Sequence, residues 1–200
     1  MSLDQKIETM LADVAKTALE HAPFSITLNC ESPIEELFAT TMWARGCWAG
    51  LVELYDNAPL ANLIDNIKQG YEVKNSFCAQ VEVAGFRVDF VMVSPMSGQD
   101  EPLVIVIECD GHDFHEKNKE QVRRDKSRER KIVAAGCKVL RFSGSEIWRD
   151  PIGCVDAVLT LANREYNASW RRHSSQIIKD FGSIGAYVDF CGRKNEGATQ

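Results

Sequence analysis

The sequence lacks the features that mark membrane, secreted or repeat proteins. No run of 18 apolar residues occurs among the 200 residues, so no membrane-spanning helix is expected. The first 12 residues contain acids and no apolar stretch, which argues against a secretory signal. No internal repeat or low-complexity segment is visible. The composition, 44% hydrophobic and 26% charged, is ordinary for one globular domain of this length.

Cysteine is present, but not in an arrangement typical of disulfides. The chain has seven cysteines, an odd number, with wide spacings and no CxxC pair. Several lie inside apolar runs, as at the end of 103–109. This pattern is typical of reduced thiols that pack as small hydrophobic side chains. We therefore expect free thiols and a cytoplasmic location.

Positive charge is scarce overall and concentrated in one segment. The net charge is −6, but residues 117–141 contain ten basic and three acidic residues, so this segment is +7 and the remainder is −13. A basic stripe on an acidic body can face phosphate, although a solvated helix face gives the same pattern. The side chains that we expect to bind nucleic acid are Lys117, Lys119, Arg123, Arg124, Lys126 and Arg128.

Hydrophobic periodicity alternates between helix and strand along the chain. Helices are expected over 3–19, from Ser32 toward Trp43, over 59–67, over 117–135 and, after a cap at Ser145 or Asp150, to about Arg172. Strands are expected over 77–83, 86–93, 103–107 and 137–142, the first two joined in a hairpin at Ala84-Gly85. This order predicts an α/β sandwich with a mixed, roughly four-stranded sheet flanked by helices.

Three acidic residues lie in or directly after these apolar strands. Asp89 interrupts the run 86–91, where strand alternation would place Phe86, Val88 and Phe90 on the opposite face. Glu108 and Asp110 end the next strand and share a face because they are two residues apart. Carboxylates gathered on adjacent strands repel one another unless a cation is present. All-oxygen ligands favour Mg²⁺ or Mn²⁺, which also supply a Lewis acid.

Purely structural roles stay open for several of these residues. Asp89 could form a salt bridge with Arg87 or Arg141. Asp125 could form an ordinary intrahelical pair with Arg128. Arg141, which lies inside a strand, is either the partner of a buried carboxylate or a phosphate clamp.

The segment after the third strand allows further readings. Asp110 could be a turn acid before a glycine. Cys109, His112 and His115 have C-x2-H-x2-H spacing, which is compatible with zinc, although no second ligand pair is evident. Either histidine could instead move a proton beside a metal, or be an ordinary loop residue.

The order and spacing of several short motifs are more specific than any one of them. They are Ser32-Pro33-Ile34-Glu35, Gln80, Asp89-Phe90, Glu108-x-Asp110-Gly111, His115 with His112 as alternate, Asp125-x-x-Arg128, and Gly136 to Phe142 with Val139 and Arg141 as fixed points. Together they resemble the PD-(D/E)xK, or restriction-endonuclease-like, superfamily. Within it they are similar to a compact endonuclease-domain family related to the very-short-patch-repair (EDxHD) endonucleases.

The resemblance covers about Ser32 to Asp156. It implies a single nuclease domain over 1–200 with a core at 32–156, extended by the helix over 3–19 and by residues 157–200. Asp110 stands where the broad superfamily has a lysine. The missing positive charge would then have to come from Lys117, Lys119 or Arg124.

The family similarity also implies an activity, a metal-dependent hydrolysis of DNA phosphodiesters. Asp89, Glu108, Asp110 and Glu35 would hold Mg²⁺ or Mn²⁺, and His115, oriented by Asp125, would assist proton transfer. Gln80, His112 and Arg141 would support the site. Two rival functions are an inactive nuclease fold that binds nucleic acid or a partner protein, and a zinc-stabilised interaction module. Neither the oligomeric state nor the strand state of the nucleic acid follows from the sequence.

Overall fold

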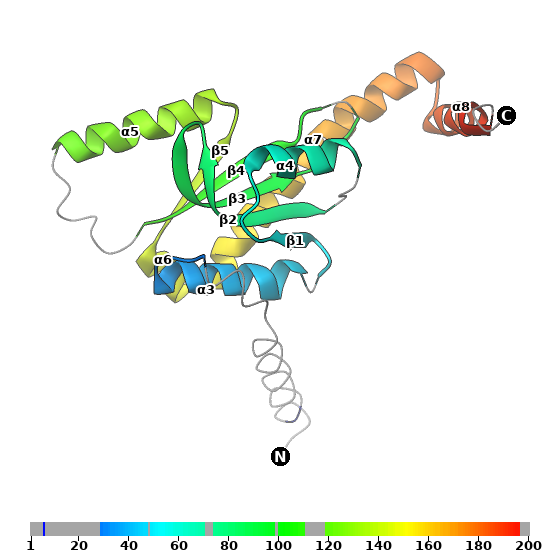
Figure 1. The fold of residues 1–200 in the computed structure, drawn as a ribbon. Helices are drawn as coiled ribbons and strands as arrows, with labels where there is room; N and C mark the ends of the chain where they lie inside the picture. Colours follow the sequence, from blue (N-terminus) through cyan, green and yellow to red (C-terminus); the bar gives the residue numbers. More distant parts are fainter. Residues whose placement is uncertain are drawn as a thin grey trace.

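The computed structural model describes residues 29–47, 49–70, 74–98, 100–110 and 119–196, together with Lys6 (Figure 1). The helix expected over 3–19 lies outside these ranges apart from Lys6. His112, His115, Lys117 and the side chain of Lys119 also lie outside the described part of the chain.

A mixed sheet of five strands forms the centre of the fold. Its strands are β1 (Val52–Tyr55), β2 (Asn75–Val83), β3 (Phe86–Ser94), β4 (Leu103–Asp110) and β5 (Lys138–Ser143). They lie side by side in chain order, with β1–β2 and β4–β5 parallel and β2–β3 and β3–β4 antiparallel. The predicted α/β class and hairpin are confirmed. The strand that the sequence analysis missed is β1, whose four residues are too few for a clear periodic pattern.

Helices cover both faces of this sheet (Figure 1). They are α3 (Pro33–Met42), continued by the π-helical turn η1 (Trp43–Cys47), α4 (Leu60–Lys68), α5 (Lys119–Ala134), α6 (Gly144–Arg149), α7 (Pro151–Phe181) and α8 (Ile184–Glu196). One hydrophobic cluster joins the sheet to α3, α6 and α7. The other joins it to α4 and α5. The result is the expected sandwich, with a separate core on each side of the sheet.

Local signals place the helix ends. Ser32 caps α3 by accepting a hydrogen bond from the Glu35 N–H. Asp150 caps α7, one of the two positions expected, whereas Ser143 rather than Ser145 caps the short helix α6. Gly136, with φ +88°, ends α5 in the left-handed conformation that glycine adopts at little cost.

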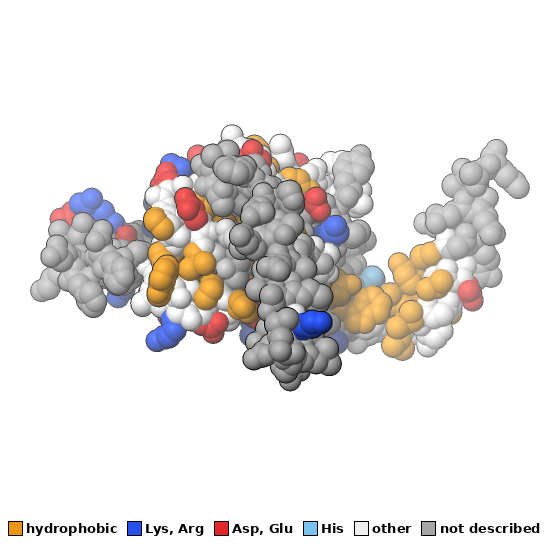
Figure 2. Space-filling model, turned by 90° about the horizontal axis from the view of Figure 1, so that it is seen from below, with side chains coloured by type: hydrophobic (Ala, Val, Ile, Leu, Met, Phe, Trp, Pro, Cys, Tyr) orange, Lys and Arg blue, Asp and Glu red, His pale blue; other side chains and the backbone are white. Residues whose placement is uncertain are grey.

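The C-terminal part extends further than expected. Helix α7 continues nine residues past the predicted end at Arg172 and, with α8, forms an arm beyond the sheet (Figure 1). Figure 2 shows hydrophobic side chains gathered on this arm, where the Phe181 ring contacts those of Tyr187 and Phe190. No described helix, α7 included, is long and apolar enough to cross a membrane.

The β2–β3 hairpin is distorted at one pair of opposed residues. The pairing register is the same on both sides, but Gln80 and Asp89 are left unpaired between the flanking pairs. Gln80 has φ +55°, in the left-handed region that non-glycine residues rarely occupy. Such a conformation costs on the order of 1–3 kcal/mol and persists only where its surroundings hold it.

This distortion reverses which face the hairpin side chains point to. Phe90 packs in the cluster with α3 and α7, whereas Val88 and Phe86 pack with the cluster under α4 and α5. The expectation that Phe86, Val88 and Phe90 share one face is therefore wrong. Simple alternation fails because the strands are irregular at Gln80 and Asp89. The side chains between this point and the turn therefore lie on the opposite face from the one that alternation predicts.

Candidate active site

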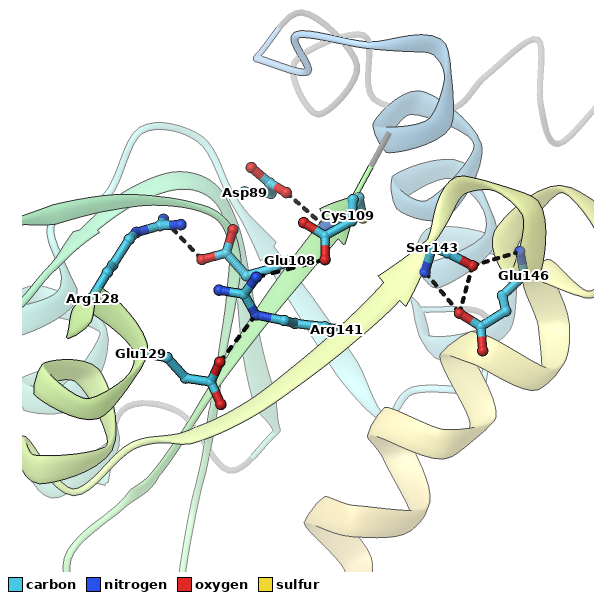
Figure 3. Close-up of polar contacts among 9 residues, drawn as sticks. Asp89, Glu108, Cys109, Arg128, Glu129, Arg141, Ser143 and Glu146 are labelled. Atoms are coloured by element: carbon cyan, nitrogen blue, oxygen red, sulfur yellow. Dashed lines mark hydrogen bonds and ion pairs between the residues drawn. The ribbon is translucent and has the colours of Figure 1, made fainter. Parts of the chain in front are cut away.

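Glu108 is buried near the end of the central strand β4, with only 5% of the residue exposed. Val104 and Val106 pack on the face covered by α4 and α5, and Glu108 continues this alternation toward α5. Arg128 of α5 meets it there, with 2.8 Å between Arg128 Nη2 and Glu108 Oε1 (Figure 3). A glutamate at the end of an apolar strand is thus neutralised by a helix of the neighbouring layer.

The charge of Glu108 is nevertheless poorly accommodated. Burial, and then repulsion by Asp89, raise the pKa of its carboxyl to about 7, against the opposing effect of Arg128 and Arg141. Within the described part of the chain, Glu108 Oε1 has no hydrogen-bond partner, so the contact with Arg128 is an ion pair without hydrogen-bond geometry. A buried carboxylate oxygen without a donor is the kind of atom that a cation can stabilise.

Asp89 lies beside Glu108, since the two residues flank the last β3–β4 pair, Phe90 with Ile107. Its Oδ2 accepts a hydrogen bond from the Cys109 N–H at 2.6 Å (Figure 3). Burial raises the pKa of Asp89 to about 6, with further contributions from Glu35 and Asp110. Burial is the main cause of both raised pKa values, and the neighbouring acids add to it, so the charged forms of both carboxyls are disfavoured here.

Glu35 approaches the same place from α3, on the other face of the sheet. Its carboxylate accepts hydrogen bonds from the Ser32 hydroxyl at 2.8 Å, the Glu31 N–H at 2.9 Å and Gln80 Nε2 at 2.9 Å. Gln80 is the residue with the unusual positive φ, so the distorted hairpin position is also the one that reaches Glu35. The predicted first acid and the predicted supporting glutamine are therefore in direct contact.

Asp110 and Arg141 lie at the outer end of this group. Arg141 Nη1 is 3.6 Å from Asp110 Oδ2, and Arg141 Nε is 3.5 Å from Glu129 Oε2. Arg141 also stands directly opposite Glu108 in the β4–β5 ladder (Figure 3). Arg141 therefore contacts the half-buried Asp110 and the more exposed Glu129, and its role as partner of a buried carboxylate or as phosphate clamp stays a prediction.

Of the expected replacements for the missing lysine, only Arg124 has a described side chain, and it does not reach the site. Arg124 pairs with Glu120 on the exposed side of α5. Arg128, one turn later, is the residue that reaches Glu108. The sequence carries a signal for this, because the apolar Ile132 follows Arg128 by four residues and residues four apart share a helix face. Ile132 is buried against the sheet, so Arg128 points toward the sheet as well.

The remaining expected partners are placed as follows. Arg87 pairs with Glu31 at 2.6 Å, not with Asp89. Asp125 is half-buried on α5, three residues before Arg128. Arg123 and Lys126 are exposed on the same helix.

The donor atoms of these residues suit a divalent ion, but the described residues do not form a complete coordination site. Among the described residues, no three His, Cys, Asp or Glu side chains lie close enough together to hold a metal. The donors are nevertheless the oxygen ligands that Mg²⁺ and Mn²⁺ prefer, and Glu108 Oε1 is buried without a hydrogen-bond donor. The donor set of Asp89 and Glu108, with Glu35 and Asp110 near, therefore suits such an ion.

The hypothesis of a zinc site at Cys109, His112 and His115 can be examined only at Cys109, because the structure does not describe the two histidines. Burial raises the pKa of this thiol well above its ordinary value, and the side chain packs against the cluster under α3 and α7. Zinc binds the thiolate, which this environment disfavours. All seven cysteines are free thiols, as expected.

A central sheet with acids gathered at the end of its inner strands is the architecture of restriction-endonuclease-like proteins. A model of the restriction-endonuclease-like family described as REase_MTES_1575 matches residues 61–161, and the chain belongs to this family. No curated protein and no solved structure matches the chain. The matched span includes Gln80, Asp89, Glu108 and Arg128 but begins after Glu35. The predicted superfamily is thereby confirmed, and family membership suggests a nuclease.

Proposed function

We propose that this protein is an Mg²⁺- or Mn²⁺-dependent endonuclease that hydrolyses DNA phosphodiester bonds. The observation that carries the proposal is the half-buried Asp89 beside the buried Glu108, whose pKa values are raised to about 6 and about 7. Buried like charges are costly to keep for packing alone. In a restriction-endonuclease-like fold, they are best explained as ligands awaiting a cation.

Asp89 and Glu108 would hold the metal directly, and Glu35 and Asp110 would complete its oxygen ligands. When bound, the ion would supply a Lewis acid that lowers the pKa of a water and neutralises charge building on the phosphate. Gln80 holds the Glu35 carboxylate through its 2.9 Å hydrogen bond and so fixes this acid relative to the sheet. The Cys109 N–H holds Asp89 Oδ2 in the same way.

Proton transfer and docking are assigned to the segment that follows β4. His115, with His112 as alternate and Asp125 as its orienting partner, would pass a proton to or from the reacting oxygen. The exposed cations Arg123, Arg124 and Lys126 of α5 would contact the nucleic-acid backbone. Arg128, farther along α5, contacts Glu108, so phosphate held along the preceding turns of the helix would lie near the acids.

The decisive experiment is incubation of the protein with supercoiled plasmid, single-stranded DNA and RNA, each with Mg²⁺, Mn²⁺ or a chelator. We expect nicking or linearisation of plasmid that requires the metal and stops with chelator. Cleavage that persists in chelator, or is absent with both metals under single-turnover conditions, contradicts the proposal. Preferential cleavage of RNA would retain the mechanism and change the substrate.

An inactive nuclease fold is the second candidate, and one observation favours it. Arg128 already neutralises Glu108, so the site can persist without a metal. Such a protein would bind DNA with the same salt dependence whether or not Mn²⁺ is present and would not cut it. Metal analysis of the purified protein tests the zinc-stabilised module, which requires about one tightly held zinc per chain.

A further inference from the structure

Among the α5 cations whose side chains the structure describes, Arg128 enters the acidic group. Its side chain is about one-quarter exposed, whereas that of Glu108 is almost fully buried. Arg128 Nη2 also donates a hydrogen bond to the Arg87 carbonyl oxygen, which ties the guanidinium to β3. The guanidinium therefore lies between β3 and β4, at the acids that would hold the metal.

Glu35, Asp89 and Glu108 are held in different ways. Glu35 accepts three hydrogen bonds and Asp89 accepts one from a backbone N–H. Glu108 Oε1 has no hydrogen-bond partner among the described residues and contacts Arg128 through charge alone. An ion pair without hydrogen-bond geometry lacks the directional part of the interaction, so another cation can replace it at lower cost.

We propose that Arg128 is a resident counter-ion of Glu108, which occupies the position of a cation in the metal-free protein and moves away when a divalent ion binds. This inference rests on the metal-dependent function proposed above. Arg128 acts through Glu108 and is therefore a positioning residue rather than a catalytic one. Its role is to hold the Glu108 carboxylate in position until the metal binds.

Charge balance is the physical reason for the exchange. One guanidinium faces Glu108 and Asp89, with Glu35 and Asp110 also acting on Asp89. Arg141 contributes from the neighbouring strand but is shared with Asp110 and Glu129. A dication compensates two carboxylates where the guanidinium compensates one. The two cations would repel each other strongly at short range in a buried site, so they compete for Glu108.

The test compares Mn²⁺ binding by the wild type, two charge-matched glutamine variants and one charge-conserving variant, without DNA and at pH 8.5, by calorimetric titration. Arg128→Gln removes the internal competitor, and we expect its Mn²⁺ dissociation constant to fall about tenfold, within the usual range of coupling between two ligands. Arg130→Gln removes the same charge from the same helix but from an exposed residue with no assigned role in the site, and it should bind Mn²⁺ like the wild type. Arg128→Lys keeps the charge and should also stay near the wild type.

Each outcome decides a different point. Equal affinity in wild type and Arg128→Gln, weaker binding by Arg128→Gln, or equal tightening in Arg130→Gln overturns the counter-ion exchange and leaves the nuclease proposal intact. Absence of Mn²⁺ binding in the wild type and all variants instead overturns the metal-dependent function. If Arg128→Gln does not fold, crystals of the wild type with Mn²⁺ decide. Arg128 Nη2 should then lie well beyond the 2.8 Å that now separates it from Glu108 Oε1, and an unchanged contact beside bound Mn²⁺ overturns the inference.

Discussion

Two ion pairs of equal length lie in different parts of this fold. Arg45 Nε and Asp156 Oδ1 are 2.8 Å apart, as are Arg128 Nη2 and Glu108 Oε1. The first pair is exposed, with 54% and 39% of the side chains accessible, and the second is not, with 26% and 7%. The same distance therefore occurs at an ordinary surface contact and inside a group of acids.

The difference shows that contact length alone does not identify a functional charge. An exposed pair contributes at most about 1 kcal/mol, because water and salt screen it. Glu108 keeps a raised pKa of about 7 despite its arginine, because burial and the nearby Asp89 outweigh that arginine. In the surface pair both charges are stabilised by water, whereas in the buried pair the charged form of Glu108 is disfavoured even beside Arg128.

Removing the acids of the buried group should have the largest effect. Asp89→Asn or Glu108→Gln should lower single-turnover plasmid cleavage by more than about 100-fold, since loss of residues that merely support metal ligands already costs about 10–100-fold. Asp156→Asn, the acid of the surface pair, is the control and should cut like the wild type. Wild-type rates in either site variant would remove these residues from the mechanism.

Gln80 tests whether the distorted hairpin serves the site. Gln80→Ala removes the hydrogen bond to Glu35 and should lower cleavage about 10–100-fold. Gln80→Gly removes the same bond but suits φ +55°, so it should be more stable than the alanine variant by about 1 kcal/mol. Chemical denaturation of both variants gives this difference. Equal stability of the two would mean that the strand relaxes out of the left-handed conformation.

The raised pKa of Glu108 predicts a pH dependence of stability. The folded value, about 7, lies above the ordinary 4.5, so the stabilising contribution of this carboxyl is fully present below about pH 4.5 and lost as pH rises through about 7. Metal-free Glu108→Gln does not titrate there. As pH rises from 4.5 to 8, the free energy of unfolding of this variant should therefore increase relative to that of the wild type by roughly 2 kcal/mol. For Glu53→Gln, which removes the acid of an exposed ion pair, the same change relative to the wild type should be less than about 0.5 kcal/mol.

The basic face of α5 predicts how binding responds to salt. Replacing Arg123, Arg124 and Lys126 with glutamine should reduce the slope of log affinity against log salt on duplex DNA by up to about 2.7, since each phosphate contact contributes about 0.9. Mn²⁺ binding should be unchanged, because the site acids are untouched. An unchanged slope would show that this face is only solvated.

The smallest effect is expected at the surface pair itself. Arg45→Gln breaks the contact with Asp156 and should change the free energy of unfolding by less than about 1 kcal/mol at low salt, and by less at high salt. Thermal melts at two ionic strengths provide the measurement. A loss of several kcal/mol would place this pair in the same category as Glu108 and remove the contrast between them.

Much of the fold could be predicted because most elements carry local signals. The apolar run of β4, the Ala84-Gly85 turn and the cap at Ser32 each specify structure within a few residues. The short strand β1 and the face reversal at Gln80 could not be predicted, since both depend on partners distant in the chain. Periodicity assigns a face only where the strand stays regular.

The candidate site was predictable as a set of residues but not as a set of contacts. Strand position identified Asp89 and Glu108 as acids on apolar strands. Which cation meets them depends on how α5 packs, and Arg128, not Arg124, faces the sheet. The hydrogen bonds that hold Glu35 come from α3 and β2 together, which no linear spacing reveals.

The central claim is that Asp89 and Glu108 together hold a divalent ion. Electron paramagnetic resonance of free Mn²⁺, titrated with metal-free protein, counts the ions taken up per chain. The account predicts saturable binding by the wild type and by Asp156→Asn, and none by the double variant Asp89→Asn with Glu108→Gln. Equal uptake by the double variant, with its fold verified by circular dichroism, would contradict the account.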